Sequence, residues 1–224
     1  GDDYLVYNVD DPLVVEMVKP AKARKIGFSK KEAGIITLSP REIRIPGRHN
    51  LANALAAAQT AYLCGVSQAV VAEVLKTFAG VEHRIEYVTG VNGVDFYNDS
   101  KGTNPDSTLA AIETFSDNRG IVLILGGRDK GVELAPLAKQ IKEKVKAVVL
   151  IGEAAGRLTE ALEQIGYKSF YQAGFSLENA VAQAYKLAGP GELVLLSPAC
   201  ASFDMFENFE ERGRVFKRLC QNLK

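Results

Sequence analysis

Cysteine and histidine are scarce in this sequence, and their positions argue against several kinds of site. The three cysteines, Cys64, Cys200 and Cys220, are odd in number and share no metal-ligand spacing, so we expect reduced thiols in a cytosolic protein. The two histidines, His49 and His83, have no obvious acid partner, which weakens the case for Cys200 as a nucleophile. A buried, unreactive thiol is the favoured interpretation of Cys200.

Other features that define whole classes of protein are also missing. Lys plus Arg and Asp plus Glu each number 27, so no excess positive charge favours nucleic acid or an anionic membrane as a partner. No apolar run approaches the roughly 18 residues of a membrane span, and no basic segment followed by an apolar one opens the chain. The phosphate-binding pattern G-x-x-x-x-G-K-[ST] is absent, as is G-x-G-x-x-G after a strand.

The chain is long enough for one large domain or two modest ones, and its hydrophobic content of 47% over 224 residues is ample for a buried core. We place a boundary near residues 80–82, because the pattern changes there from helices to a hairpin and then to a regular alternation. A strand-like run begins almost at the first residue, and the chain starts with Gly1 and not with Met. Both observations suggest a piece of a longer protein.

Residues 1–81 are expected to contain short strands and helices. Strands are predicted at 4–9, 25–28, 35–38 and 43–45. An Ala-rich helix is predicted from residue 48 to about residue 64 with Asn50 as its N-cap, and Ser67 is expected to cap a second helix. Asn53 is unusual inside a helix because asparagine is a poor helix former. Its amide can match the donor and acceptor edge of an adenine, although capping and solvation also explain it.

Residues 82–224 alternate regularly between strand and helix patterns. A hairpin over residues 85–96 is expected to turn at Asn92-Gly93. Helices are predicted at 106–115, 134–143, 154–165, 177–187 and 205–220, and buried strands at 121–125, 147–151, 169–171 and 193–196. Strand and helix in strict succession predict an α/β fold with a mostly parallel, doubly wound, Rossmann-like sheet.

Three loops at predicted strand ends have unusual side chains. Residues 98–104 offer a carboxylate, an ammonium group and two hydroxyls, residues 126–131 offer glycines and a lysine, and residues 197–204 begin with small, uncharged side chains. Doubly wound sheets bind ligands at the carboxyl ends of their strands, so all three loops could converge on one site. The alternative is that they are ordinary solvated loops, since loops are polar by default and a Gly-Gly turn can simply be a tight strand exit.

Several segments together resemble the Mur ligases. They are NDSKGTNP at 98–105, LLSPACASFD at 195–204 followed by NFEERG at 208–213, the pair His83-Arg84, and HNLAN at 49–53. The resemblance covers essentially the whole chain, and the loop at 99–104 is most similar to that of the family members that add D-glutamate. It implies that residues 1–81 are the C-terminal part of a central ATPase-type domain and that residues 82–224 are the Rossmann-like C-terminal domain.

The resemblance implies an ATP-dependent amide ligase of peptidoglycan precursor synthesis in the cytoplasm. ATP would phosphorylate the alanyl carboxylate of UDP-N-acetylmuramoyl-L-alanine, and the amine of D-glutamate would attack the acyl phosphate. Mg²⁺ is the implied metal. The family's N-terminal domain and the P-loop half of its central domain have no counterpart here, so we expect no metal ligands, no ligation by this chain alone, and a monomer. The alternative is a noncatalytic module that binds a nucleotide or an amino acid.

Roles for individual residues also follow from the resemblance. Asn50 and Asn53 match positions on the adenine side, and Arg84 and Asp99 match contacts to the phosphate and ribose of ATP. The residues that match the D-glutamate pocket are Lys101, Thr103, Lys130, Ser202, Phe203 and Phe209. Such a set suits a dicarboxylate, which needs two ammonium groups together with hydroxyl and backbone donors. The aromatic rings would exclude water from the acyl phosphate.

Overall fold

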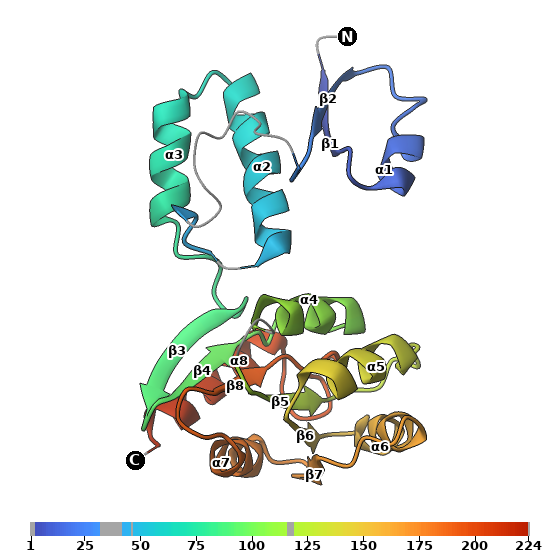
Figure 1. Cartoon of the computed structure of the whole chain (residues 1–224), viewed down its shortest axis with the longest axis vertical. Helices are drawn as coiled ribbons and strands as arrows, with labels where there is room; N and C mark the ends of the chain where they lie inside the picture. Colours follow the sequence, from blue (N-terminus) through green and yellow to red (C-terminus); the bar gives the residue numbers. More distant parts are fainter. Residues whose placement is uncertain (1–2, 32–41, 46, 116–118, 224) are drawn as a thin grey trace. The chain divides into compact units, whose positions relative to one another are not determined.

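The computed structural model describes residues 3–31, 42–45, 47–115 and 119–223 (Figure 1). It divides into two compact units, Gly1–Gly80 and Val81–Lys224, which are described separately below. The division lies at the boundary expected near residues 80–82, and the identity assigned to each domain stays a prediction.

The first unit begins with a small parallel sheet. Strands β1 (Tyr4–Asn8) and β2 (Arg24–Phe28) pair along their whole length. Helix α1 (Pro12–Met17) connects them, and its N-terminus is capped by the Asp11 carboxylate, which accepts hydrogen bonds from the backbone of Leu13 and Val14. The strands predicted at 4–9 and 25–28 are thereby confirmed, whereas the predicted strand at 35–38 lies outside the described residues.

Two helices complete the first unit, α2 (Arg48–Leu63) and α3 (Gln68–Thr77). The N-cap of α3 is Ser67, as expected, because its side chain accepts a hydrogen bond from Val70 N. The prediction that Asn50 is the N-cap of α2 is wrong. Gly47 occupies that position without a side-chain hydrogen bond, so Asn50 lies within the first turn of the helix.

The strand predicted at 43–45 is also absent. Ile43 is buried, and it belongs to a small core cluster with Ala54, Ala58, Val71 and Leu75 of the two helices. Ile43 and Ile45 therefore serve helix packing and not a sheet. A segment of three residues is too short for its pattern to distinguish the two.

The second unit is built on a six-stranded sheet in the order β3-β4-β8-β5-β6-β7 (Figure 1). All pairs are parallel except the edge hairpin β3-β4. The strands are β3 (Glu86–Val91), β4 (Val94–Asn98), β5 (Ile121–Gly126), β6 (Ala147–Ile151), β7 (Phe170–Gln172) and β8 (Leu193–Leu196). The predicted doubly wound α/β architecture is confirmed. The hairpin turns at Asn92 and Gly93, whose φ values of 50° and 81° suit a type I′ turn.

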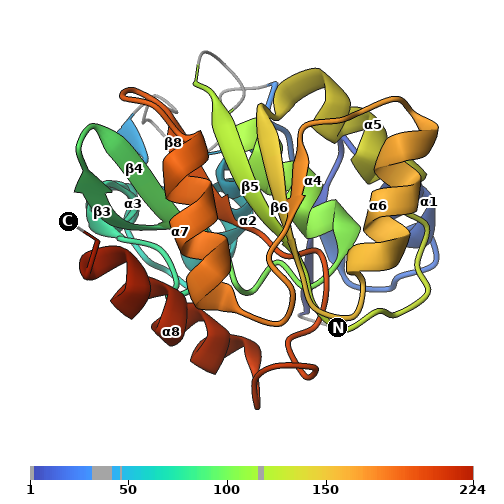
Figure 2. The same ribbon diagram turned by 90° about the horizontal axis from the view of Figure 1, so that it is seen from below.

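Helices cover both faces of this sheet, and each face has its own apolar cluster (Figures 1 and 2). On β5, Leu123 points into the first cluster and Ile124 into the second. The helices of the first face are α4 (Pro105–Phe115), α5 (Ala135–Lys144) and α6 (Ala155–Gln164), and those of the second are α7 (Leu177–Leu187) and α8 (Phe209–Gln221). Burial on both faces explains the uninterrupted apolar strands of the sequence.

Helix α8 starts later than the predicted residue 205. Asn208 caps it by accepting a hydrogen bond from Glu211 N at 2.8 Å, so the helix begins at Phe209. Met205 and Phe206 precede the helix and pack against the second apolar cluster. In the described part of the chain, no helix combines the length and apolar character needed to cross a membrane.

Candidate functional site

Three loops meet where strands β4, β8 and β5 end. Strand β8 lies between β4 and β5 and is parallel to both, so residues 98–104, 126–131 and 197–204 leave the same edge of the sheet. Arg128 N donates a hydrogen bond to Ala201 O at 2.8 Å, and Lys130 Nζ donates one to Thr103 O at 3.0 Å. The convergence expected from the sequence is therefore confirmed, at the type of position where open α/β sheets bind ligands.

Gly127 makes the close approach of two of these loops possible. Its φ of 137° lies in a region that other residues rarely adopt, and a Cβ atom at this position would overlap with Ala201 O. The glycine is therefore required by the packing of backbone against backbone, as well as by the turn that ends β5.

Asp99, in the loop at residues 98–104, has a buried carboxylate. Its Oδ2 accepts a hydrogen bond from Ser197 Oγ at 2.7 Å, and its Oδ1 accepts one from Ile85 N at 3.3 Å. Burial raises the pKa of Asp99 to about 6, although the hydrogen bond from Ser197 and the charge of Arg84 oppose this rise. The side chain is 0% exposed, so in this structure both oxygens serve contacts within the protein.

Arg84 is presented by an unusual stretch of backbone. The residues on either side of it, His83 and Ile85, have φ values of 65° and 47°. This region is unfavourable for a β-branched residue and costs on the order of 1–3 kcal/mol. The hydrogen bond from Ile85 N to Asp99, and another from Lys101 N to His83 O at 3.1 Å, hold the stretch in place. Asp99 thus fixes the backbone that carries Arg84.

A fully buried arginine ties two of the three loops together. Arg212, on α8, donates through Nε to Ser100 Oγ at 3.0 Å and through Nη2 to Ser100 O at 2.9 Å, and both Nη atoms reach Cys200 O at 3.2 Å. Sequence reasoning did not single out this residue. A signal was available, because Arg212 shares the helix face of the buried residues Phe216 and Cys220, four and eight positions later.

The residues predicted to hold D-glutamate lie on the three loops and at the start of α8. Lys101 and Lys130 are both exposed, and Lys101 Nζ lies 4.9 Å from the centroid of the Phe209 ring. Phe203 is 63% exposed, whereas Ser202 is buried beside it. The structure therefore gathers two ammonium groups and two aromatic rings on the three loops and on the start of α8.

Cys200 lies among these residues but has none of the properties of a nucleophile. It is buried, and burial raises the pKa of its thiol to about 11. Its carbonyl oxygen, rather than its sulfur, makes the contacts to Arg212. The structure thus agrees with the interpretation of Cys200 as an unreactive core thiol.

Asn50 and Asn53, the other residues predicted for the ATP side, belong to the first unit. Both lie in the first two turns of α2, where Asn53 Nδ2 donates a weak hydrogen bond to Asn50 Oδ1 at 3.4 Å. Asn50 is buried and Asn53 is exposed. The adjacent amides are compatible with reading the edge of a base, which stays a prediction.

Among the described residues, one group of side chains could hold a metal ion: Glu82, His83 and Glu86. Lys217 Nζ already contacts these glutamates, at 3.2 Å from Glu82 Oε1 and 2.6 Å from Glu86 Oε1. His83 Nδ1 is engaged by the amide of Asn98 at 2.9 Å. Mg²⁺ prefers an octahedron of oxygen ligands, so a cluster with a histidine and a resident ammonium does not fit this ion.

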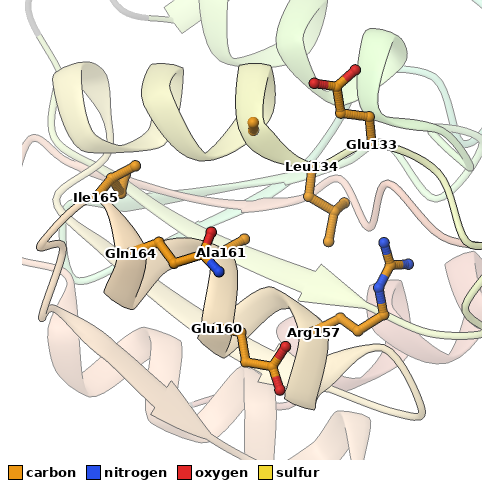
Figure 3. A pocket seen from close by; sticks show the side chains of 8 residues that line it. Glu133, Leu134, Arg157, Glu160, Ala161, Gln164 and Ile165 are labelled. Carbon is orange, nitrogen blue, oxygen red and sulfur yellow. The ribbon is translucent and has the colours of Figure 1, made fainter.

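A separate groove with a volume of about 290 Å³ opens between the start of α5 and helix α6 (Figure 3). Its lining is apolar at Leu134, Ala161 and Ile165, and it also includes polar side chains such as Glu133 and Gln164. Arg157 stands at one end of the groove, and in Figure 3 its guanidinium points away from Glu160.

The comparisons with known proteins agree with this architecture. The family described as "Mur ligase, glutamate ligase domain" matches residues 83–200. The proteins named "UDP-N-acetylmuramoylalanine--D-glutamate ligase" of Thermoanaerobacter sp. (strain X514) and of Clostridioides difficile (strain 630) are 47% and 40% identical over 244 and 241 residues. Each alignment covers 100% of this chain and 53% of the relative, so the chain spans about half the length of these relatives.

Solved structures show the same fold at lower identity. MurF from Acinetobacter baumannii aligns with a TM-score of 0.71 at 17% identity, covering 98% of this chain and 52% of the other. Folylpolyglutamate synthase from Mycobacterium tuberculosis aligns with a TM-score of 0.70 at 18% identity, covering 95% and 55%.

Fold and loops together define an α/β domain of the type that binds ligands where the parallel strands end. The family match extends over more than half of the chain and includes two of the three loops entirely. The chain belongs to the Mur ligase family.

Proposed function

We propose that this chain provides the D-glutamate pocket and part of the ATP site of an ATP-dependent ligase that joins D-glutamate to UDP-N-acetylmuramoyl-L-alanine. The observation that carries the proposal is the convergence of the three loops, which brings Lys101 and Lys130 to one edge of the sheet. The names of relatives that align with the whole chain at 40–47% identity support this substrate.

The chemistry of the loops suits an amino dicarboxylate. Two exposed ammonium groups can each pair with one carboxylate, while the Thr103 and Ser202 hydroxyls add donors that fix orientation. A fixed orientation matters because the amine must approach the acyl carbon of an activated carboxylate before water does. Phe203 and Phe209 provide apolar surface over the same loops, and we propose that they exclude water from the acyl phosphate.

For ATP, we propose Asn50 and Asn53 on the adenine side and, on the phosphate and ribose side, Arg84 together with Asp99, whose buried carboxylate holds the backbone at Arg84. Arg84 is favoured because a strained backbone presents it beside the loop at residues 98–104. Mg²⁺ would bind with the phosphates, but we assign none of its ligands to this chain. With no P-loop sequence in the 224 residues, we expect the chain alone to release no ADP when both substrates are supplied.

Calorimetric titration with D-glutamate tests the proposal. We expect binding by the wild-type chain and loss of binding in Lys130→Ala, because one carboxylate then loses its ammonium partner. Lys139→Ala, which changes an exposed lysine on α5, is the matched control, and L-glutamate is the control for stereochemistry. Equal binding by the wild type and the Lys130 variant would contradict the proposed pocket. The noncatalytic module would be favoured if the chain binds D-glutamate but gives no turnover when it is combined with the missing half of a related ligase.

A further inference from the structure

Arg157 on α6 contacts the loop that carries Lys130 at two points. Its Nη1 donates to Asp129 Oδ1 at 2.6 Å, and its Nη2 donates to Val132 O at 2.9 Å. The two acceptors lie on either side of Lys130 in the sequence. One guanidinium thus bridges the loop before and after the lysine, a geometry that a planar fork of donors provides and a single ammonium does not.

The backbone at Lys130 is fixed further by Asp129. Its Oδ1, which receives the Arg157 hydrogen bond, also accepts one from Gly131 N at 2.9 Å. The peptide that follows Lys130 is therefore held by one carboxylate oxygen of the residue before it, and that oxygen is held by Arg157. At the end of its side chain, Lys130 Nζ reaches Thr103 O on the neighbouring loop.

We propose that Arg157 is a positioning residue for Lys130, and that it sets the affinity of the site for the carboxylate that Lys130 binds. This inference rests on the proposed role of Lys130 in holding D-glutamate. Arg157 is not among the side chains proposed to touch D-glutamate, because its guanidinium is engaged by Asp129 and Val132 O at the end of the groove between α5 and α6 (Figure 3). It acts through the loop at residues 129–132.

An exposed ion pair is often energetically neutral, so the proposal depends on the second contact. The pair between Arg128 and Glu153 provides the comparison. It lies in the same region at 3.8 Å, has only one contact, and both side chains are about half exposed at 53% and 44%. Loss of that pair leaves the loop's internal hydrogen bonds intact, whereas loss of Arg157 releases Asp129 and Val132 together.

The test uses the whole chain and four proteins: wild type, Arg157→Ala, Arg157→Lys and the control Arg128→Ala. Hydrogen exchange of the peptide that includes Gly131 N–H reports on the loop, calorimetry reports the D-glutamate Kd, and thermal unfolding reports global stability. In Arg157→Ala we expect exchange to be faster and the Kd to be weaker, each by roughly tenfold, with Tm nearly unchanged. Arg157→Lys should be intermediate, and Arg128→Ala should match the wild type in the exchange of Gly131 N–H and in Tm.

Each other outcome is decisive. Unchanged exchange in Arg157→Ala would overturn the proposal, as would faster exchange with an unchanged D-glutamate Kd. If Arg157→Ala loses as much unfolding free energy as binding free energy, Arg157 has a merely structural role. If the wild type binds no D-glutamate, the proposed function fails and the ligand part of this inference fails with it. The exchange data then still decide whether Arg157 orders the loop.

Discussion

Arg212 is expected to be the side chain whose loss most damages the site. The perturbation is Arg212→Met, which keeps the length of an apolar stem but removes the guanidinium. Burial lowers the pKa of Arg212 to about 10, so the side chain stays charged at neutral pH. Its four hydrogen bonds reach Ser100 and Cys200, which belong to two different loops.

The magnitude follows from the groups left behind. Methionine leaves the carbonyl oxygens of Ser100 and Cys200 buried without this partner, and each orphaned acceptor costs about 1–3 kcal/mol. Relief from burying a cation offsets part of this loss. We therefore expect a net destabilisation of about 2–4 kcal/mol, which lowers the Tm of a unit of this size by about 5–15 °C.

The assay is thermal unfolding followed by near-UV circular dichroism. Arg218→Met is the matched control, because Arg218 lies on the same helix but is exposed, and its loss should cost less than about 1 kcal/mol. An Arg212→Met variant as stable as the wild type, or more stable, would refute the reasoning. It would mean that the desolvation of the buried cation outweighs its hydrogen bonds.

Three further outcomes are expected. First, carboxyl-carbon NMR should give Asp99 a titration midpoint near pH 6, and a midpoint near 4 would contradict this. Because this folded-state pKa lies above the unfolded value of 3.8, the wild type should gain Tm relative to Asp99→Asn as the pH falls from 7 to 4. Second, Gly127→Ala should lower the free energy of unfolding by about 2–3 kcal/mol, because the added Cβ meets Ala201 O. The helical control Gly156→Ala has open space around it and should be neutral or stabilising. Equal stability of the two variants would be inconsistent with the loop packing. Third, a thiol reagent at pH 8 should label Cys64 alone in the folded chain and should label Cys200 and Cys220 only after unfolding. Mass spectrometry counts the labels. Rapid labelling of Cys200 would show that its thiol is accessible.

The parallel sheet was predictable because both of its faces are buried. Strands such as β5 and β8 are apolar at every position, and the helices between them follow the helical period. The turn at Asn92-Gly93 was equally clear, because few other residue pairs adopt its backbone angles. Because the carboxyl ends of parallel strands lie at one edge of a sheet, the three loops could be expected there.

Local signals failed where a longer-range contact decided the structure. Asn50 has the residue type of an N-cap, but α2 begins earlier, after Gly47. Ile43 has the residue type of a strand, but it is buried by two helices. Arg212 lies 112 positions from Ser100 in the sequence, so only the fold reveals that one guanidinium joins two loops. The left-handed backbone at Ile85 is likewise invisible in the sequence, because Ile85 N donates the hydrogen bond that holds it to Asp99, 14 positions away.

The central claim, a D-glutamate pocket at the ends of β4, β8 and β5, is tested most directly by residue-resolved NMR. Amide shifts would be recorded during titration of the isotope-labelled chain with D-glutamate and, separately, with L-glutamate. We expect D-glutamate to shift the amides of residues 98–104, 126–131 and 197–204 and L-glutamate to leave them nearly unchanged. Shifts confined to other parts of the chain, or equal responses to both enantiomers, would contradict it.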